Sequence, residues 1–368
     1  MNILLCFGTR PEAIKMAPLV HEFRKTKFQI KVCVTGQHRE MLDQVLSFFE
    51  IVPSYDLNLM RSNQTLNELS SRIILEIDKI LSQEKFDLVL VHGDTTTSIM
   101  VALAAFHKGI KIGHVEAGLR TYNKYSPFPE EINRQLTGRV ADIHFAPTNR
   151  AKANLLSEGV KEELILVTGN TIIDALFLTL DKIKNGYKNE TIKQLESQID
   201  FSKKIVLVTG HRRESFGLGF ENICKAILEI SRDKELEIVY PVHLNPNVQT
   251  LVYERLSNVE NIHLIEPIDY PSFIWLMSNS SLIISDSGGI QEEAPSLQIP
   301  VIVTRNTTER FEGVEAGFSF LTGTEVSAIV LKAKEILQTE YKFNIKENPY
   351  GAGKASHKII EYIKNQLN

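Results

Sequence analysis

The sequence is poor in several features that mark whole classes of protein. It has three cysteines in 368 residues, Cys6, Cys33 and Cys224, and a formal net charge of −4. Because the thiols are so few and so far apart, we expect them to be buried and reduced, in a reducing compartment. The small negative charge leaves no basic surplus for binding nucleic acid or an anionic membrane.

Long apolar runs are missing as well. No run approaches the roughly 20 apolar residues that a membrane-spanning helix needs. The first apolar run, "NILLCF", is short and has no basic residues before it, so it predicts a β-strand rather than a signal peptide. We therefore expect a cytoplasmic protein without a membrane partner.

Familiar catalytic motifs are also absent. No G-x-G-x-x-G follows a strand-like run, and the chain has no Walker A loop, G-x-S-x-G elbow, H-E-x-x-H motif or paired C-x-x-C. Their absence argues against nicotinamide redox chemistry, nucleoside triphosphate hydrolysis, serine esterase chemistry and zinc catalysis.

What the sequence does contain is a regular alternation of strand-like and helical stretches. Continuous apolar runs such as "FDLVLVHG" and "KIVLVTG" are separated by amphipathic segments, which is typical of parallel sheets covered on both faces. We predict an α/β protein with two doubly wound, Rossmann-like domains. The first spans 1–170 and is joined by a C-terminal helix, 355–368, while the second spans 171–354. A lysine- and asparagine-rich stretch, Lys182 to Lys204, interrupts the alternation, and we expect a hinge near 170–204.

Acidic residues follow several predicted strands. Asp94 ends "VHGD", Glu116 lies in "HVEAGLR", and Glu130 follows two prolines. Successive strands of one parallel sheet deliver Asp94 and Glu116 to the same edge, where clustered carboxylates suit acid–base chemistry. Each residue alone also has a structural interpretation: an ion pair of Glu116 with Arg120, a helix cap for Asp94, and a favourable position at a helix N-terminus for Glu130.

Other residues at predicted strand ends suit an anionic ligand. Arg10 and Lys15 flank the turn after the first strand, and His211 follows the first strand of the second domain. The sequence Ser287-Gly288-Gly289 opens a helix whose N–H groups can bind phosphate, and Glu293 can accept hydrogen bonds from a ribose diol. The structural alternatives are a solvated capping turn in the first domain and an ordinary strand-to-helix turn in the second.

A series of stretches along the chain resembles one enzyme family, the bacterial non-hydrolysing UDP-N-acetylglucosamine 2-epimerases. In chain order they are "FGTRPEAIKMAPLV", "TGQHREMLDQVL", "VLVHGDTTTS", "GHVEAGLRT", "PEEINRQLTG", "TGNTIIDAL", "VTGHRRESFG", "YPVHLNPNV" and "SDSGGIQEEAPSL". The resemblance implies the two-domain fold of B-type glycosyltransferases, with a deep interdomain cleft. It also implies a homodimer that uses no cofactor, neither NAD nor metal.

The resemblance further implies the reversible conversion of UDP-N-acetylglucosamine to UDP-N-acetylmannosamine, for bacterial surface polysaccharides. In that family UDP leaves to give 2-acetamidoglucal and then adds back. The implied catalytic residues are Asp94, Glu116, Glu130 and His211, and the sequence does not say which carboxylate is the base. The implied substrate-binding residues add Arg10, Lys15, Ser287, Gly288, Gly289, Ile268 and Phe273 near uracil, Glu293 at the ribose, and Arg310 at a phosphate or the sugar. Gln37, His38 and Arg39 match a second, activating site of the family.

Three rival functions stay open from the sequence. A hydrolysing epimerase shares the fold but releases UDP and free N-acetylmannosamine. A glycosyltransferase of the same architecture needs an acceptor and brings no solvent hydrogen into the sugar. A nucleotide-sugar-binding module without catalysis does not need its carboxylates to be acid–base groups.

Overall fold

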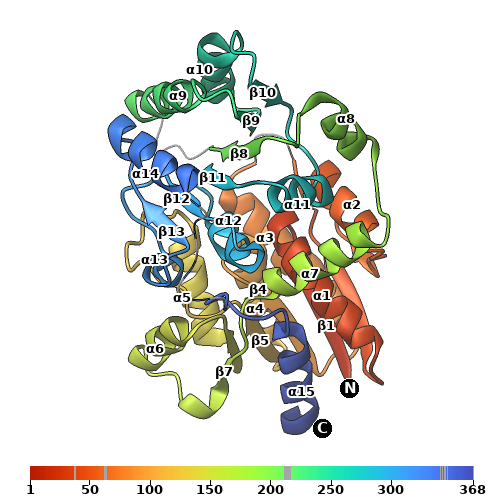
Figure 1. Cartoon of the computed structure of the whole chain (residues 1–368). Helices are drawn as coiled ribbons and strands as arrows, with labels where there is room; N and C mark the ends of the chain where they lie inside the picture. The colour runs from red at the N-terminus through yellow and green to blue at the C-terminus, as the bar shows by residue number, and fades with distance from the viewer. Residues whose placement is uncertain are drawn as a thin grey trace. The chain divides into compact units, whose positions relative to one another are not determined.

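Two α/β units make up the chain. The computed structural model describes all residues except 37–38, 62–63, 211–216, 340, 342, 344, 346 and 368. Unit 1 comprises Met1–Leu178 together with Tyr350–Asn368, and unit 2 comprises Thr179–Pro349. The two units therefore divide after Leu178 and after Pro349, whereas the domain boundaries expected from the sequence lie after 170 and after 354. The C-terminal helix belongs to unit 1 (Figure 1).

Unit 1 contains a seven-stranded parallel sheet in the order β3-β2-β1-β4-β5-β6-β7. Its strands are β1 (Asn2–Phe7), β2 (Gln29–Val34), β3 (Tyr55–Asp56), β4 (Leu88–His92), β5 (Lys111–Val115), β6 (Ile143–Ala146) and β7 (Ile165–Val167). Its helices are α1 (Arg10–Arg24), α2 (Arg39–Phe48), α3 (Leu66–Gln83), α4 (Thr96–His107), α5 (Glu130–Val140), α6 (Asn149–Ser157), α7 (Thr171–Lys184, which continues into unit 2) and α15 (Ala355–Leu367).

The strand order of unit 1 reverses between β1 and β4, which are hydrogen-bonded neighbours. Because all strands run parallel, the segments that follow β1, β4 and β5 leave the sheet at one carboxyl edge. Ligands of open α/β sheets bind at such a switch point. The edge of unit 1 therefore carries the segments with Arg10, Asp94 and Glu116.

The core of unit 1 follows from the apolar content of its strands. One cluster joins β1 and β4 to α3 and α4, with Leu4, Val89, Ile77 and Val101 all fully buried. Helix α15 packs against α1, and its Tyr362 ring meets the ring of Phe145 in β6 edge to face. The C-terminal segment thus completes the cover of the first sheet.

Unit 2 contains a six-stranded parallel sheet in the order β10-β9-β8-β11-β12-β13. Its strands are β8 (Lys204–Thr209), β9 (Leu236–Pro241), β10 (Ile262–Ile265), β11 (Leu282–Ser285), β12 (Val301–Val303) and β13 (Ser319–Leu321). Its helices are α8 (Glu190–Gln198), α9 (Leu218–Ile230), α10 (Pro246–Leu256), α11 (Tyr270–Ser278), α12 (Gly288–Glu293), α13 (Phe311–Glu315) and α14 (Val326–Gln338). The order reverses between β8 and β11, so the segment with Ser287 starts at that switch point.

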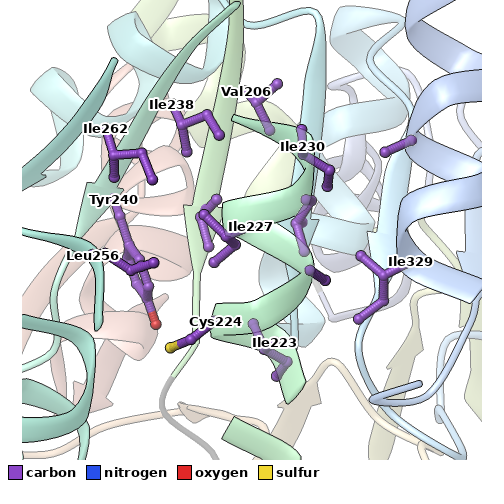
Figure 2. Close-up of a cluster of buried hydrophobic side chains, with 14 of the residues drawn as sticks. Val206, Ile223, Cys224, Ile227, Ile230, Ile238, Tyr240, Leu256, Ile262 and Ile329 are labelled. Carbon is purple, nitrogen blue, oxygen red and sulfur yellow. The ribbon is translucent and has the colours of Figure 1, made fainter. Parts of the chain in front are cut away.

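The apolar face of α9 fills the core of unit 2. Figure 2 shows Ile227 and Ile230 of this helix against Ile238 of β9 and Ile329 of α14. Tyr240 of β9 directs its phenol toward the same helix, and burial raises the pKa of this tyrosine well above its usual value. Two doubly wound sheets confirm the predicted fold class.

Several details differ from the sequence prediction or complete it. The stretch expected to contain the hinge, 170–204, contains the two helices α7 and α8, and units 1 and 2 divide within α7. The short edge strands β3 and β13 escape prediction because two or three residues carry no periodicity. Cys6, Cys33 and Cys224 are buried and unbonded, as expected.

Among the residues that the structure describes, no helix is both long enough and apolar enough to cross a bilayer.

Candidate functional site

The turn after β1 is held by one buried carboxylate, Glu12. Thr9 caps α1, and the Glu12 side chain accepts hydrogen bonds from the backbone N–H groups of Gly8 and Thr9 at 3.0 and 2.8 Å. Its other oxygen accepts from the Thr95 hydroxyl at 2.7 Å, in the turn after β4. Burial raises the pKa of Glu12. This residue therefore joins the turn that carries Arg10 to the turn that carries Asp94.

Glu116 lies directly after β5 and is held by side chains from three other segments. Lys15 Nζ is 2.5 Å from Oε1, Asn170 Nδ2 donates to the same oxygen at 2.8 Å, and His92 Nε2 is 3.4 Å from Oε2. The backbone of Glu116 has φ 61°, a left-handed conformation that is uncommon outside glycine and often occurs at functional sites. The structure thus brings together two predicted site residues, Glu116 and Lys15.

Two of the structural alternatives from the sequence are wrong. Arg120 binds both oxygens of Glu158, at 2.7 and 2.8 Å, so its ion pair is with that residue and not with Glu116. Thr95, not Asp94, caps α4, because its hydroxyl accepts from the backbone N–H of Ser98. The carboxylates of Asp94 and Glu116 are thus explained by neither alternative.

Asp94 is positioned by two residues of α5. Arg134 Nη2 donates to its carboxylate at 2.6 Å, and Asn133 Nδ2 donates to its backbone carbonyl at 2.9 Å. Glu130 begins the same helix, as the dipole argument expects, and its Oε2 is a buried oxygen without a hydrogen-bond partner. Helix α5 therefore orients Asp94 and also carries Glu130, whose Oε2 has unused capacity to accept a hydrogen bond.

Three buried histidines lie in the strands that lead to this edge. Desolvation lowers the pKa of His92 to about 4, that of His114 to about 3 and that of His144 to about 4. Each of these rings is therefore neutral at pH 7. In the contacts given above, Glu116 consequently faces the cation of Lys15 and the neutral imidazole of His92.

At the edge of unit 2, Arg310 lies against the first turn of α12. A Cβ atom placed on Gly288 would lie 3.1 Å from the Arg310 guanidinium carbon, so any larger residue would require the guanidinium to shift. Arg310 pairs with Glu292 at 2.9 Å and with Glu309 at 2.5 Å. Ser287 precedes this helix, and its backbone N–H donates to the Ser285 hydroxyl at 2.9 Å.

The remaining predicted residues of unit 2 lie near α11 and α12. Glu293 is buried at the end of α12, and the Tyr270 hydroxyl donates to its Oε1 at 2.7 Å. Phe273 on α11 and Ile268, which precedes that helix, are both partly exposed. Gly289 follows Gly288 in the first turn of α12.

Some predicted residues lie outside the described part of the chain: His211, Gln37 and His38, together with the side chain of Arg39. Their expected roles in catalysis and activation stay predictions.

Sequence reasoning missed several residues that hold the predicted ones. They are Glu12, His92, Arg134, Asn170 and Glu292. Two signals were available: "TRPE" is a capping-box pattern, and Asn170 lies in the "TGNTIIDAL" stretch. The partners of His92, Arg134 and Glu292 depend on distant segments, which no local pattern gives.

Two other observations bear on ligands. A surface hollow of about 610 Å³ lies between α9 and α14, lined by residues that include Lys225, Glu229 and Val330, and no predicted site residue lines it. Within the described residues, no group of three or more His, Cys, Asp or Glu side chains is arranged to hold a metal ion.

Comparisons with known proteins point to one family. The family described as UDP-N-acetylglucosamine 2-epimerase matches residues 21–364. The chain is 53% identical over 374 residues to the UDP-N-acetylglucosamine 2-epimerase of Salmonella typhimurium, covering 99% of each chain. Its fold is similar to the Neisseria meningitidis UDP-GlcNAc 2-epimerase bound to UDP-GlcNAc, with TM-score 0.92, 49% identity and full coverage of both chains. It is also similar to the Methanocaldococcus jannaschii UDP-GlcNAc 2-epimerase in complex with UDP-GlcNAc and UDP, with TM-score 0.85 and 34% identity. This match covers 99% of the present chain and 100% of the other.

Proposed function

The chain belongs to the UDP-N-acetylglucosamine 2-epimerase family, and we propose that it interconverts UDP-N-acetylglucosamine and UDP-N-acetylmannosamine without hydrolysis. The observation that carries the proposal is the carboxyl edge of unit 1. There, parallel strands deliver Asp94 and Glu116 to one side of the sheet, and each carboxylate is held by a buried cation, Arg134 and Lys15 respectively. Fixed carboxylates at a sheet edge are what proton transfer to and from a sugar carbon needs.

The chemistry requires more than one acid–base group. The C2 proton of the sugar is not acidified by a carbonyl, so we infer that it is removed as the bond from C1 to the UDP oxygen breaks. The bonding electrons leave with UDP, and the product is 2-acetamidoglucal. A proton then returns to C2 on the opposite face and UDP adds back to C1. Removal on one face and return on the other need groups on both sides, a role that we assign jointly to Asp94, Glu116 and Glu130.

We assign the nucleotide to unit 2. The N–H groups of Gly288 and Gly289 would bind the diphosphate at the start of α12. Ser287 would contact it through its hydroxyl, because its own N–H donates to the Ser285 hydroxyl. Arg310 would contact a phosphate or the sugar from a position fixed by two carboxylates. Glu293 would accept from the ribose, with Phe273 and the backbone of Ile268 at the uracil.

Arg10, Lys15 and His211 complete the proposal as groups that stabilise the departing diphosphate. Lys15 can serve both the diphosphate and Glu116, because an ammonium group has three donors. A homodimer, a cytoplasmic location, activation by substrate at Gln37, His38 and Arg39, and a role in surface polysaccharide synthesis stay predictions from the sequence.

The test is proton NMR of the enzyme with UDP-N-acetylglucosamine in D₂O. We expect UDP-N-acetylmannosamine to form and deuterium to enter at C2 in both sugars, with little free UDP. Stoichiometric release of UDP with free N-acetylmannosamine would replace the proposal by a hydrolysing epimerase. An unchanged sugar without deuterium would support one of the other two interpretations, a glycosyltransferase or a binding module without catalysis.

A further inference from the structure

Asn170 connects three parts of unit 1 and has no role in the proposed function so far. It lies between β7 and α7 and is 2% exposed. Its side-chain oxygen accepts from the backbone N–H of Ile172 at 3.1 Å, and its side-chain nitrogen donates to the Glu116 carboxylate at 2.8 Å. Its backbone N–H donates to the backbone carbonyl of Tyr350 at 2.7 Å. A buried amide with this set of contacts is fixed in one orientation.

The contact with Ile172 decides which way the amide points. Since a backbone N–H can only donate, the atom that faces Ile172 must be the oxygen of Asn170. The nitrogen must then face Glu116, and it donates to Oε1, the same oxygen that binds Lys15. A hydrogen bond donated to a carboxylate favours its ionised form.

The contact with Tyr350 ties this amide to the segment where the chain re-enters unit 1. The backbones of 169–170 and 350–351 pass so closely that side chains do not fit between them. A Cβ atom on Gly169 would lie 3.1 Å from the Tyr350 carbonyl oxygen, and one on Gly351 would lie 3.2 Å from the Gly169 Cα. Both glycines also have positive φ, 90° and 120°. Asn170 is therefore anchored by the backbone on both sides.

We propose that Asn170 is a positioning residue for the epimerisation: its amide holds the Glu116 carboxylate in place and favours its ionised form. The proposal rests on the proposed function, because it requires Glu116 to act in the reaction. It extends that function by making the proton-transfer group depend on the junction between β7, α7 and the returning chain.

A cap of α7 with no further role is the alternative, and two substitutions separate it from the proposal. Asn170→Asp keeps an oxygen for Ile172, since aspartate caps helices well. It removes the donor to Glu116 and places a second carboxylate beside it. Asn170→Ser also keeps a capping oxygen but is too short to reach Glu116, and it adds no charge.

Asn189 provides a matched control in unit 2. It caps α8 by accepting from the backbone N–H of Ile192 at 2.9 Å, and its amide donates to the Asp269 carboxylate at 2.7 Å. Asn189→Asp therefore makes the same chemical change at a helix cap beside a carboxylate that we do not place in the reaction.

The experiment measures the pH dependence of kcat for each variant with UDP-N-acetylglucosamine. Like charges raise the pH at which neighbouring carboxylates ionise, so for Asn170→Asp we expect the limb that reports Glu116 to move to higher pH by about one unit. For Asn170→Ser we expect a loss in kcat of roughly tenfold, the scale of one lost hydrogen bond to a charged group. For Asn189→Asp we expect the wild-type profile.

A second readout does not depend on turnover. The side-chain ¹³C signal of Glu116, assigned by its loss in Glu116→Gln, is titrated with pH in wild type and in Asn170→Asp. We expect its midpoint to rise in the variant. An unmoved midpoint with an unmoved kcat profile would overturn the inference and leave Asn170 as a cap. Absence of epimerisation by the wild type would instead overturn the proposed function, and the ¹³C titration would still show whether Asn170 holds Glu116.

Discussion

The carboxyl edges of the two units are built from the same sheet topology but hold their charges in opposite ways. In unit 1 two carboxylates of the edge each have a buried cation: Asp94 meets Arg134, and Glu116 meets Lys15. Polar side chains from other segments donate further hydrogen bonds, so the two acidic residues are surrounded by donors. A parallel sheet thus positions acid–base groups by surrounding each with donors from other strands.

In unit 2 a cation is the centre. Arg310 lies between the carboxylates of Glu292 and Glu309, against the bare backbone of Gly288. Arg305 also pairs with Glu309, at 3.0 Å, so two carboxylates balance two guanidinium groups, and backbone N–H groups at the start of α12 can add to the attraction for an incoming anion. On the proposed function we expect chemistry at the edge of unit 1 and recognition at the edge of unit 2, a division that the following substitutions test.

The largest effect is expected from Asp94→Asn in unit 1. The amide keeps the size of the side chain but cannot exchange the proton, so kcat should fall by roughly a hundredfold or more, the scale of lost acid–base catalysis. UDP binding should stay near wild type, since the nucleotide is assigned to unit 2. Turnover by NMR and UDP binding by calorimetry measure the two quantities.

The control for Asp94→Asn is Glu158→Gln, which alters a carboxylate of unit 1 that pairs with Arg120 rather than with the site. It should keep kcat within a few-fold of wild type. Turnover of Asp94→Asn near the wild-type rate would show that Asp94 only orients α5, and the division between the units would lose its main support.

Much of this arrangement could be predicted from the sequence, because it depends on short local patterns. Buried strand runs gave the two parallel sheets, and the ends of those runs located Asp94, Glu116 and the glycines before α12. The pairing of Lys15 with Glu116 could not be predicted, since these residues are 101 positions apart and meet only in the folded sheet. Helix α8 was not predicted, because charged and amide residues make up most of its length.

The histidines give the second comparison between the units. His92, His114 and His144 are buried in unit 1, where desolvation lowers the pKa of each to between about 3 and about 4. Among the described residues of unit 2, His263 is partly exposed and contacts the Glu237 carboxylate. The buried rings should therefore make unit 1 sensitive to acid.

The sign follows from proton binding. Below the ordinary pKa of histidine, about 6.5, these three histidines bind protons in the unfolded chain. In the folded chain they stay neutral until the pH falls to between about 4 and about 3. The contribution of these neutral rings to the free energy of unfolding is thus complete above about pH 6.5 and decreases as the pH falls. Burial raises the pKa of Glu12 and of Asp174, which act in the opposite direction. A single histidine variant separates the two effects.

We predict that wild type loses more unfolding free energy than His144→Gln when the pH is lowered from 7 to 4.5. The difference between the two losses should be about 2 kcal/mol. Urea unfolding at the two pH values measures the difference. His107→Gln, which removes an exposed histidine at the end of α4, is the control and should leave the pH dependence unchanged. An equal loss of stability in wild type and His144→Gln would contradict the assignment of acid sensitivity to the buried rings.

The smallest effect is expected in unit 2, from Glu293→Gln. Glutamine still accepts from Tyr270, so the local fold should survive, but the neutral amide is a weaker acceptor for a ribose diol. UDP affinity should fall by about tenfold, equal to about 1.4 kcal/mol, while kcat at saturating substrate stays near wild type. Glu325→Gln, at an exposed position before α14, is the control. A loss confined to kcat would place Glu293 in the chemistry, so that acids of both units would act in proton transfer and the division between reaction and recognition would fail.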